Sequence, residues 1–175
     1  MRYLVLFIVS FFLVSCSTVR VNYDYDKDTD FSNYGTYNYH PHMSTGLTEL
    51  DEKRLLNLMD ITLQIKGMVY SEEPDFLIDI TSEYFQNSQS TAMGVGVGGT
   101  GGNVGGGVSI GIPVGQKRLQ RQIYFKFIDA ERGQLFWEGV GESSFKENVS
   151  PTEREQKLME LVDKVLSKYP PKTKR

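Results

Sequence analysis

The stretch RQIYFKFIDAERGQLFWEGVGE, residues 121–142, constrains the fold of this chain most, because it predicts two strands that lie side by side. Two runs rich in residues that favour strands flank residues 129–133, where Gly133 can take the positive φ of a short loop. Antiparallel pairing of the two runs would give the centre of a sheet. We expect the remaining elements to add strands to this hairpin or to cover it.

Three further segments alternate apolar or aromatic residues with polar ones, which is the period of a half-buried strand. In one of them Phe76, Ile78 and Ile80 fall on one face. Another ends at Pro41, because proline has no N–H to donate to a neighbouring strand. The three predicted strands are residues 19–26, the segment around Tyr37 and Tyr39, and residues 74–84.

Two segments have the spacing of amphipathic helices instead. The first covers residues 48–66, with Thr48 or Ser44 as the N-cap and Gly67 where a C-cap glycine belongs. The second begins with Ser150 as its N-cap. The predicted buried stripe of the first helix is Leu55, Leu58, Met59, Thr62 and Ile65. That of the second helix is Leu158, Leu161, Val162, Val165 and Leu166.

These elements predict one α+β domain in a chain of 175 residues, of which 39% are hydrophobic. The expected architecture is a two-layer sandwich: a mostly antiparallel sheet of about five strands, with two amphipathic helices on one face. The domain is expected to span residues 19–171, with a glycine-rich insertion at residues 94–115. A basic tail follows at residues 172–175.

The first 15 residues have the pattern of a secretory signal peptide. Arg2 gives a positive start, and the apolar run at residues 3–14 is too short to cross a bilayer core of about 30 Å as a helix. The run ends in Leu13-Val14-Ser15-Cys16, which resembles the lipobox of bacterial lipoproteins. The resemblance implies cleavage after residue 15, diacylglycerol on the thiol of Cys16 and a palmitate-type acyl chain on its amine. The alternative is an ordinary signal peptide with an incidental cysteine.

Lipidation of Cys16 would anchor the chain to a membrane through several acyl chains, each buried CH₂ contributing about 0.8 kcal/mol. Residues 16–18 would form the lipidated N-terminus and a short linker. Cys16 is the only cysteine, so no intramolecular disulfide is available and the core must hold the fold together. Ser17 follows it, which resembles lipoproteins sorted to the outer membrane. We expect the periplasmic face, with surface exposure as the open alternative.

Several motifs follow one another in a characteristic order along the chain. They are DYDKDTDFSNYGTYNY, the Lys66-Gly67 helix end, PDFLIDI, GQLFWEGVGE and the closing KYPP. Their order resembles that of the bacterial lipoproteins that carry the domain of unknown function numbered 4136, over nearly all of the chain after the signal peptide. The resemblance implies an envelope lipoprotein with an α+β fold, and it supplies no active site.

Metal binding is not expected, although two weak candidates exist. His40 and His42 would share one face of a strand, but Pro41 breaks the strand and no third ligand is near in sequence. The second candidate is an aspartate series with the spacing of a calcium loop, which lacks the glycine and glutamate that an EF-hand needs. The aspartates are Asp24, Asp26, Asp28 and Asp30.

The glycine-rich segment, residues 94–115, allows two interpretations. The first is a disordered loop, because glycine loses the most entropy on ordering. The second is a ribbon that contacts a partner protein or the membrane, because four apolar residues alternate there with small ones. They are Val108, Ile110, Ile112 and Val114. A G-x-G-x-x-G match in this segment has no helix after it, so no nucleotide site is expected.

No catalytic arrangement is recognisable: there is no G-x-S-x-G motif, and Cys16 would be consumed by lipid. A net charge of −3 without a basic stripe argues against nucleic acid as a partner. The sequence thus predicts a non-catalytic structural or binding module, with no cofactor beyond the lipid and an envelope protein as a possible partner. The alternative is a small-ligand carrier or enzyme with a pocket between sheet and helices, lined by tyrosines and Trp137.

Overall fold

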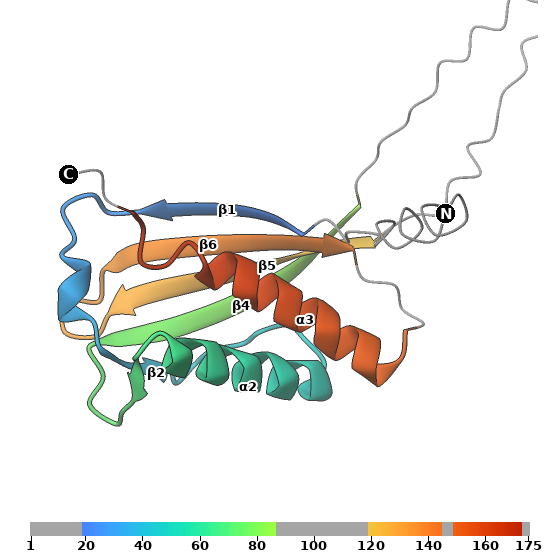
Figure 1. The fold of residues 1–175 in the computed structure, drawn as a ribbon, viewed down its shortest axis with the longest axis horizontal. Coiled ribbons are helices and arrows are strands. Elements are labelled where there is room, and N and C mark those ends of the chain that lie inside the picture. Colours follow the sequence, from blue (N-terminus) through green and yellow to red (C-terminus); the bar gives the residue numbers. More distant parts are fainter. Residues whose placement is uncertain (1–18, 87–118, 145–148, 173–175) are drawn as a thin grey trace, which may run out of the picture.

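Figure 1 shows the computed structural model of the chain, which describes residues 19–86, 119–144 and 149–172. A six-stranded sheet in the order β1-β6-β5-β4-β2-β3 carries two helices on one face. In the described part of the chain no helix has both the length and the apolar character needed to span a membrane. The elements are β1 (Arg20–Tyr25), the 3-10 turn η1 (Phe31–Asn33), β2 (Thr36–Tyr39), α2 (Glu49–Ile65), β3 (Val69–Tyr70), β4 (Phe76–Gln86), β5 (Leu119–Asp129), β6 (Leu135–Ser144) and α3 (Pro151–Leu166).

The α+β class is confirmed, but the expectation of a mostly antiparallel sheet of about five strands is wrong. The sheet is mixed and has six strands, because β2 pairs in parallel with both β3 and β4. Between β2 and β4 the chain passes through α2, and such a crossover returns it to the same end of the sheet and so allows parallel pairing. β3 has only two residues, too few to show an alternating pattern in the sequence.

The core lies between the sheet and the helices. The predicted hairpin of β5 and β6 forms around a turn in which Gly133 has φ 65°. A Cβ added to Gly139 would lie 2.7 Å from Val165 Cγ1, so α3 packs almost directly on the backbone of β6. The predicted buried stripe of α3 is confirmed at all five positions. The sheet residues beneath the helices include Phe76, Ile78, Ile80, Ile123, Phe125, Phe127 and Trp137, all fully buried.

Helix α2 is positioned as predicted except at its last residue. Thr48 is the N-cap, and Leu55, Leu58 and Met59 are buried, as is Leu63, while Thr62 is half-buried. Ile65 was expected in the core but is 82% exposed. The cause is the turn at Gly67, which has φ 85° and lets the Met68 N–H donate to the Leu63 carbonyl. Met68 then takes the core position and leaves Ile65 outside.

Candidate functional site

Buried polar side chains gather mainly at one end of the core, next to the N-termini of both helices. This end is also where β1 begins, because Arg20 pairs with Glu142 near the end of β6. Four side chains from α2, β5 and α3 meet there, and we call them the Asp51 cluster. They are Asp51, Arg54, Arg121 and Arg154.

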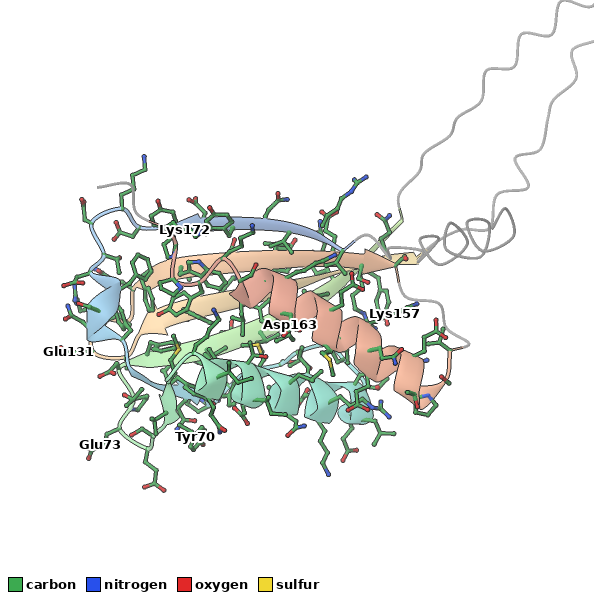
Figure 2. The ribbon with its side chains drawn as sticks, viewed as in Figure 1. Tyr70, Glu73, Glu131, Lys157, Asp163 and Lys172 are labelled. Atoms are coloured by element: carbon green, nitrogen blue, oxygen red, sulfur yellow. The ribbon has the colours of Figure 1, made fainter. Side chains whose placement is uncertain are left out.

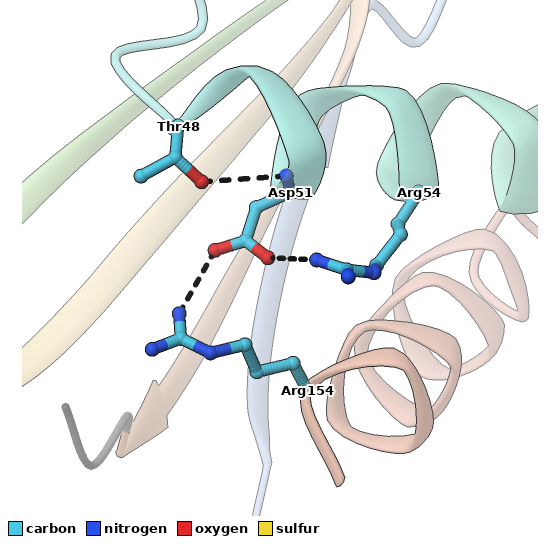
Figure 3. Close-up of polar contacts among 4 residues, drawn as sticks. All are labelled: Thr48, Asp51, Arg54 and Arg154. Atoms are coloured by element: carbon cyan, nitrogen blue, oxygen red, sulfur yellow. Dashed lines mark hydrogen bonds and ion pairs between the residues drawn. The ribbon is translucent and has the colours of Figure 1, made fainter. Parts of the chain in front are cut away.

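Asp51 is the centre of this cluster (Figure 3). Its Oδ1 accepts a hydrogen bond from Arg54 Nη1 at 2.8 Å, and its Oδ2 accepts one from Arg154 Nη1 at 3.1 Å. The Asp51 side chain is only 4% exposed, whereas those of Arg54 and Arg154 are 22% and 29% exposed. The Thr48 hydroxyl accepts from the Asp51 N–H at 3.4 Å and places the carboxylate in the first turn of α2. The arrangement ties the first turn of α3 to that of α2.

Arg121 brings the sheet into the same cluster. Its guanidinium lies 4.0 Å from the centre of the Tyr84 ring, at cation–π distance. Burial lowers the pKa of Arg121, and the charge of Asp51 opposes this effect. The guanidinium nevertheless stays protonated, as arginine does throughout proteins. Arg121 and Arg154 each have further interactions besides these.

The chemistry of the Asp51 cluster is that of a structural ion-pair network. A general base needs an oxygen able to reach a substrate proton, and both oxygens of Asp51 already accept from arginines. Fixed guanidinium–carboxylate contacts hold the first turns of the two helices together at one end of the core, beside Arg121 of β5. The geometry therefore favours a structural role for Asp51 over acid–base catalysis.

A second polar contact joins α2 to β2. The hydroxyls of Tyr37 and Tyr39 both donate to Asp60 Oδ1, at 2.8 and 2.7 Å. Burial raises the pKa of both phenols, and the hydrogen bond to Asp60 raises it further. Both tyrosines therefore remain neutral donors at physiological pH and fix α2 against the sheet.

Two cavities lie at the other end of the sheet, away from the Asp51 cluster. One has a volume of about 270 Å³, and at its edge Asp129 accepts from the Tyr34 hydroxyl at 2.8 Å and from the Arg132 N–H at 2.7 Å. The other, of about 300 Å³, lies where β1 ends and β6 begins. The first is lined by Asn33, Tyr34, Pro74, Asp75, Asp129, Glu131 and Arg132. The second is lined by Asp24, Tyr25, Asp26, Leu135, Phe136, Trp137 and Glu138.

Trp137 is fully buried. The sequence predicted it as a lining residue if a pocket existed between sheet and helices. Its ring packs against Phe127 and Tyr169, with ring centroids 4.7 and 5.2 Å apart. Among the described residues, the side chains of sheet and helices pack closely around Trp137, although Trp137 is also one of the residues next to the second cavity. Both cavities described above lie at strand ends instead.

His40 and His42 lie together where β2 ends, with ring centroids 6.0 Å apart. The His42 N–H donates to His40 Nδ1 at 3.3 Å. Among the residues that the structure describes, no group of three or more His, Cys, Asp or Glu side chains is placed to hold a metal ion. The carboxylates of Asp26 and Asp30 accept from backbone N–H groups two residues on, as in ordinary turns.

Other predicted positions lie outside the described residues. These are the lipidation site Cys16 and the ribbon residues Val108, Ile110, Ile112 and Val114. The sequence in turn gave no sign of the Asp51 cluster. An acidic residue in a first helical turn and scattered arginines are ordinary surface features, and only the packing of α2 on α3 brings them together.

Comparison with known proteins identifies a family and a fold. A family model described as a domain of unknown function (DUF4136) matches residues 21–171. A comparison with curated protein sequences gives no significant match. Because the family match covers most of the chain, it shows the family, whereas the solved structures with a similar fold have low identity and show the fold alone.

One similar structure is the crystal structure of a PDZ domain protein from Parabacteroides distasonis ATCC 8503. It is 15% identical with a TM-score of 0.57, and the match covers 95% of this chain and 40% of that one. This chain therefore spans less than half the length of that protein. Another is a PelC dodecamer from Paraburkholderia phytofirmans, 13% identical with a TM-score of 0.50, covering 86% of this chain and 96% of that one. By the match over residues 21–171, the chain belongs to the DUF4136 family.

Proposed function

We propose that this chain is a lipoprotein held in the outer membrane by lipid on Cys16, with a non-catalytic binding or structural domain that faces the periplasm. The observation that carries the proposal is the Leu13-Val14-Ser15-Cys16 motif directly before the folded domain. β1 begins at Arg20, four residues after Cys16. Four extended residues span at most about 14 Å, so the anchor would keep the domain close to the membrane.

The position of β1 also gives the anchored domain a direction. Arg20 lies at the end of the sheet where β6 ends and where the Asp51 cluster joins the first turns of α2 and α3. That end would face the membrane. Figure 1 shows that both helices run from it toward the opposite end, where η1 and β3 lie. Those elements would point into the periplasm.

The binding-module part of the proposal is supported by how the domain is packed. The space between sheet and helices is filled with aromatic and aliphatic side chains, including the fully buried Trp137 and Tyr37. A small-ligand carrier or enzyme of the kind considered from the sequence would use that space as its pocket. A filled core leaves the surface as the part of this domain that can recognise another molecule.

The anchor is tested by replacing one residue of the motif. Cells that express the full-length chain are fed an alkyne-bearing palmitate, fractionated, and examined for label on the protein. We expect the wild type to be labelled and to sediment with the outer membrane, and Cys16→Ala to lose the label. The neighbouring Ser17→Ala variant is the matched control and should remain labelled. A wild-type chain without label would contradict the anchor.

A further inference from the structure

We propose that the domain has a docking surface where the end of α2 meets β3, and that its partner is a protein segment carrying apolar side chains flanked by basic ones. We call it the α2–β3 surface. The proposal names the binding surface of the module proposed above, and so rests on that function. Its residues are Ile61, Ile65 and Tyr70, with Glu72 and Glu73 at its rim.

The first observation is that large apolar side chains gather at this corner. Ile61 and Ile65 are one turn apart on α2 and are 47% and 82% exposed, and Tyr70 on β3 is 52% exposed. Successive side chains of a strand point to opposite faces, and the Tyr70 ring lies 5.9 Å from that of Tyr37 on the helix-bearing face, so Val69 faces the other side of the sheet. Figure 2 shows Tyr70 at this corner, below the end of α2. Single exposed apolar residues are common on proteins, but several on two adjoining elements are a candidate interaction site. Other exposed apolar residues of the described chain are scattered over different elements: Tyr23, Leu50, Tyr84, Leu135 and Met159.

The second observation is that β3 forms an edge of the sheet. The Val69 N–H donates to the Gly35 carbonyl and the Ser71 N–H donates to the Tyr37 carbonyl. Because backbone groups alternate in direction along a strand, the N–H and C=O of Tyr70 point away from β2. An extended segment of a partner could add to this edge and lay alternate side chains over Ile65.

The third observation is the charge at the rim. Glu72 and Glu73 are exposed just after β3, and Figure 2 shows Glu73 on the loop at the same corner of the domain as Tyr70. The nearby Lys66 ammonium instead donates to the Tyr169 carbonyl at 3.0 Å. An acidic rim attracts basic side chains of a partner and repels anionic lipid headgroups.

The same charges argue against a second copy as the occupant. Two copies anchored through Cys16 in one membrane would point the same way. Pairing through this surface would then place the acidic rims of both copies at one interface with no basic side chain of the surface to offset them, which is unfavourable. The α2–β3 surface also lies at the end of the sheet opposite Arg20, away from the membrane. A basic, apolar segment of another protein fits all of these conditions.

The test uses the full-length chain in detergent as bait for a displayed library of random short peptides. We expect selected peptides to combine alternating apolar residues with Lys or Arg flanks, and to bind more weakly as salt is raised. Fluorescence anisotropy should show affinity at least about tenfold lower for Ile65→Lys and for the double variant Glu72→Lys, Glu73→Lys. Leu50→Lys, at a 65% exposed position of the same helix, is the matched control and should bind as the wild type does.

Four other outcomes would contradict the proposed partner. Peptides that bind Ile65→Lys as tightly as the wild type would overturn the α2–β3 surface and leave the binding module standing. A library that yields no binder would contradict both. Sedimentation that shows a dimer lost in Ile65→Lys would assign the surface to a second copy instead. Binding of the Cys16→Ala chain to vesicles of phosphatidylethanolamine and phosphatidylglycerol, lost with Ile65→Lys added, would assign it to lipid. Both results would overturn a basic protein partner.

Discussion

At the scale of single residues, the Asp51 side chain joins the first turns of α2 and α3. One carboxylate, almost fully buried, binds an arginine from its own helix and another from α3. Taking charged groups out of water is costly, so such a contact is stable only while every partner is present. The N-terminal ends of both helices are therefore joined through a single side chain.

Replacing Asp51 by Asn should lower the free energy of unfolding by about 2–3 kcal/mol, because Arg54 and Arg154 would lose their shared carboxylate. Urea unfolding followed by circular dichroism measures the change. Glu155→Gln, an exposed position near the start of α3, is the control and should stay within about 0.5 kcal/mol of the wild type. An equal, small effect of both substitutions would contradict the buried ion pair.

The contact between Tyr34 and Asp129 predicts how stability depends on pH. Burial alone would raise the pKa of Asp129, but hydrogen bonds from Arg132 and Tyr34 outweigh it and lower the pKa below its usual value. Burial, and then the bond to Asp129, raises the pKa of Tyr34 to about 12. The aspartate thus stabilises the fold above its unfolded pKa of about 4, and this is lost as the pH falls below it. The tyrosine stabilises it below about pH 10, and this is lost as the pH rises toward 12.

Tyr34→Phe should therefore reduce the loss of stability on both sides: below about pH 4 and between about pH 10 and 12. Unfolding free energies measured across the pH range, with tyrosine ionisation followed by absorbance, would show this. Tyr23→Phe changes a tyrosine that is 45% exposed and should keep the wild-type profile. If the Tyr34→Phe profile had the slopes of the wild type, the hydrogen bond would not be coupled to folding.

These residue contacts could not be read from the sequence. The Oδ2 of Asp51 accepts from Arg154, which is far away in the chain, and no local pattern relates the two positions. Tyr34 and Asp129 are likewise brought together only by the pairing of strands. Properties that depend on near neighbours, such as the caps at Thr48 and Ser150, were predicted and are confirmed.

At the scale of elements, the close approach of α3 to β6 depends on glycine. A Cβ added to Gly139 would lie 2.5 Å from the Trp137 ring and 2.7 Å from Val165. Gly139→Ala should therefore cost about 1–3 kcal/mol through overpacking. Thermal or urea unfolding checks it, with Gly35→Ala as the control because its Cβ would meet only Asp75, at 3.9 Å. A Gly139→Ala protein as stable as the control would mean that α3 does not sit this close to the sheet.

The elements themselves were largely predictable, because alternation and helical periodicity are local signals. Their arrangement was less so. The parallel pairing of β2 with β4 depends on the end of the sheet to which α2 returns the chain. The two residues of β3 are too few to show a periodic pattern in the sequence. Ile65 was placed in the buried stripe because the periodicity continues to it, whereas the turn at Gly67 substitutes Met68 in the core.

At the scale of the whole molecule, the two ends of the domain differ. Arg20 and the Asp51 cluster lie at the end that would face the membrane, and the α2–β3 surface lies at the other end. A short connection from Cys16 to β1 would keep the Arg20 end of the domain next to the membrane. The anchored end would then be occupied by structural contacts, and the far end would be available to a partner in the periplasm.

The anchoring and orientation of the domain depend most directly on the state of Cys16, which is best measured by mass spectrometry of the full-length gene product purified from membranes. We predict a mature N-terminus at Cys16 that carries a diacylglycerol on its thiol and an acyl chain on its amine. An N-terminus at any other residue, or an unmodified Cys16, would contradict the anchor and with it the orientation of the domain.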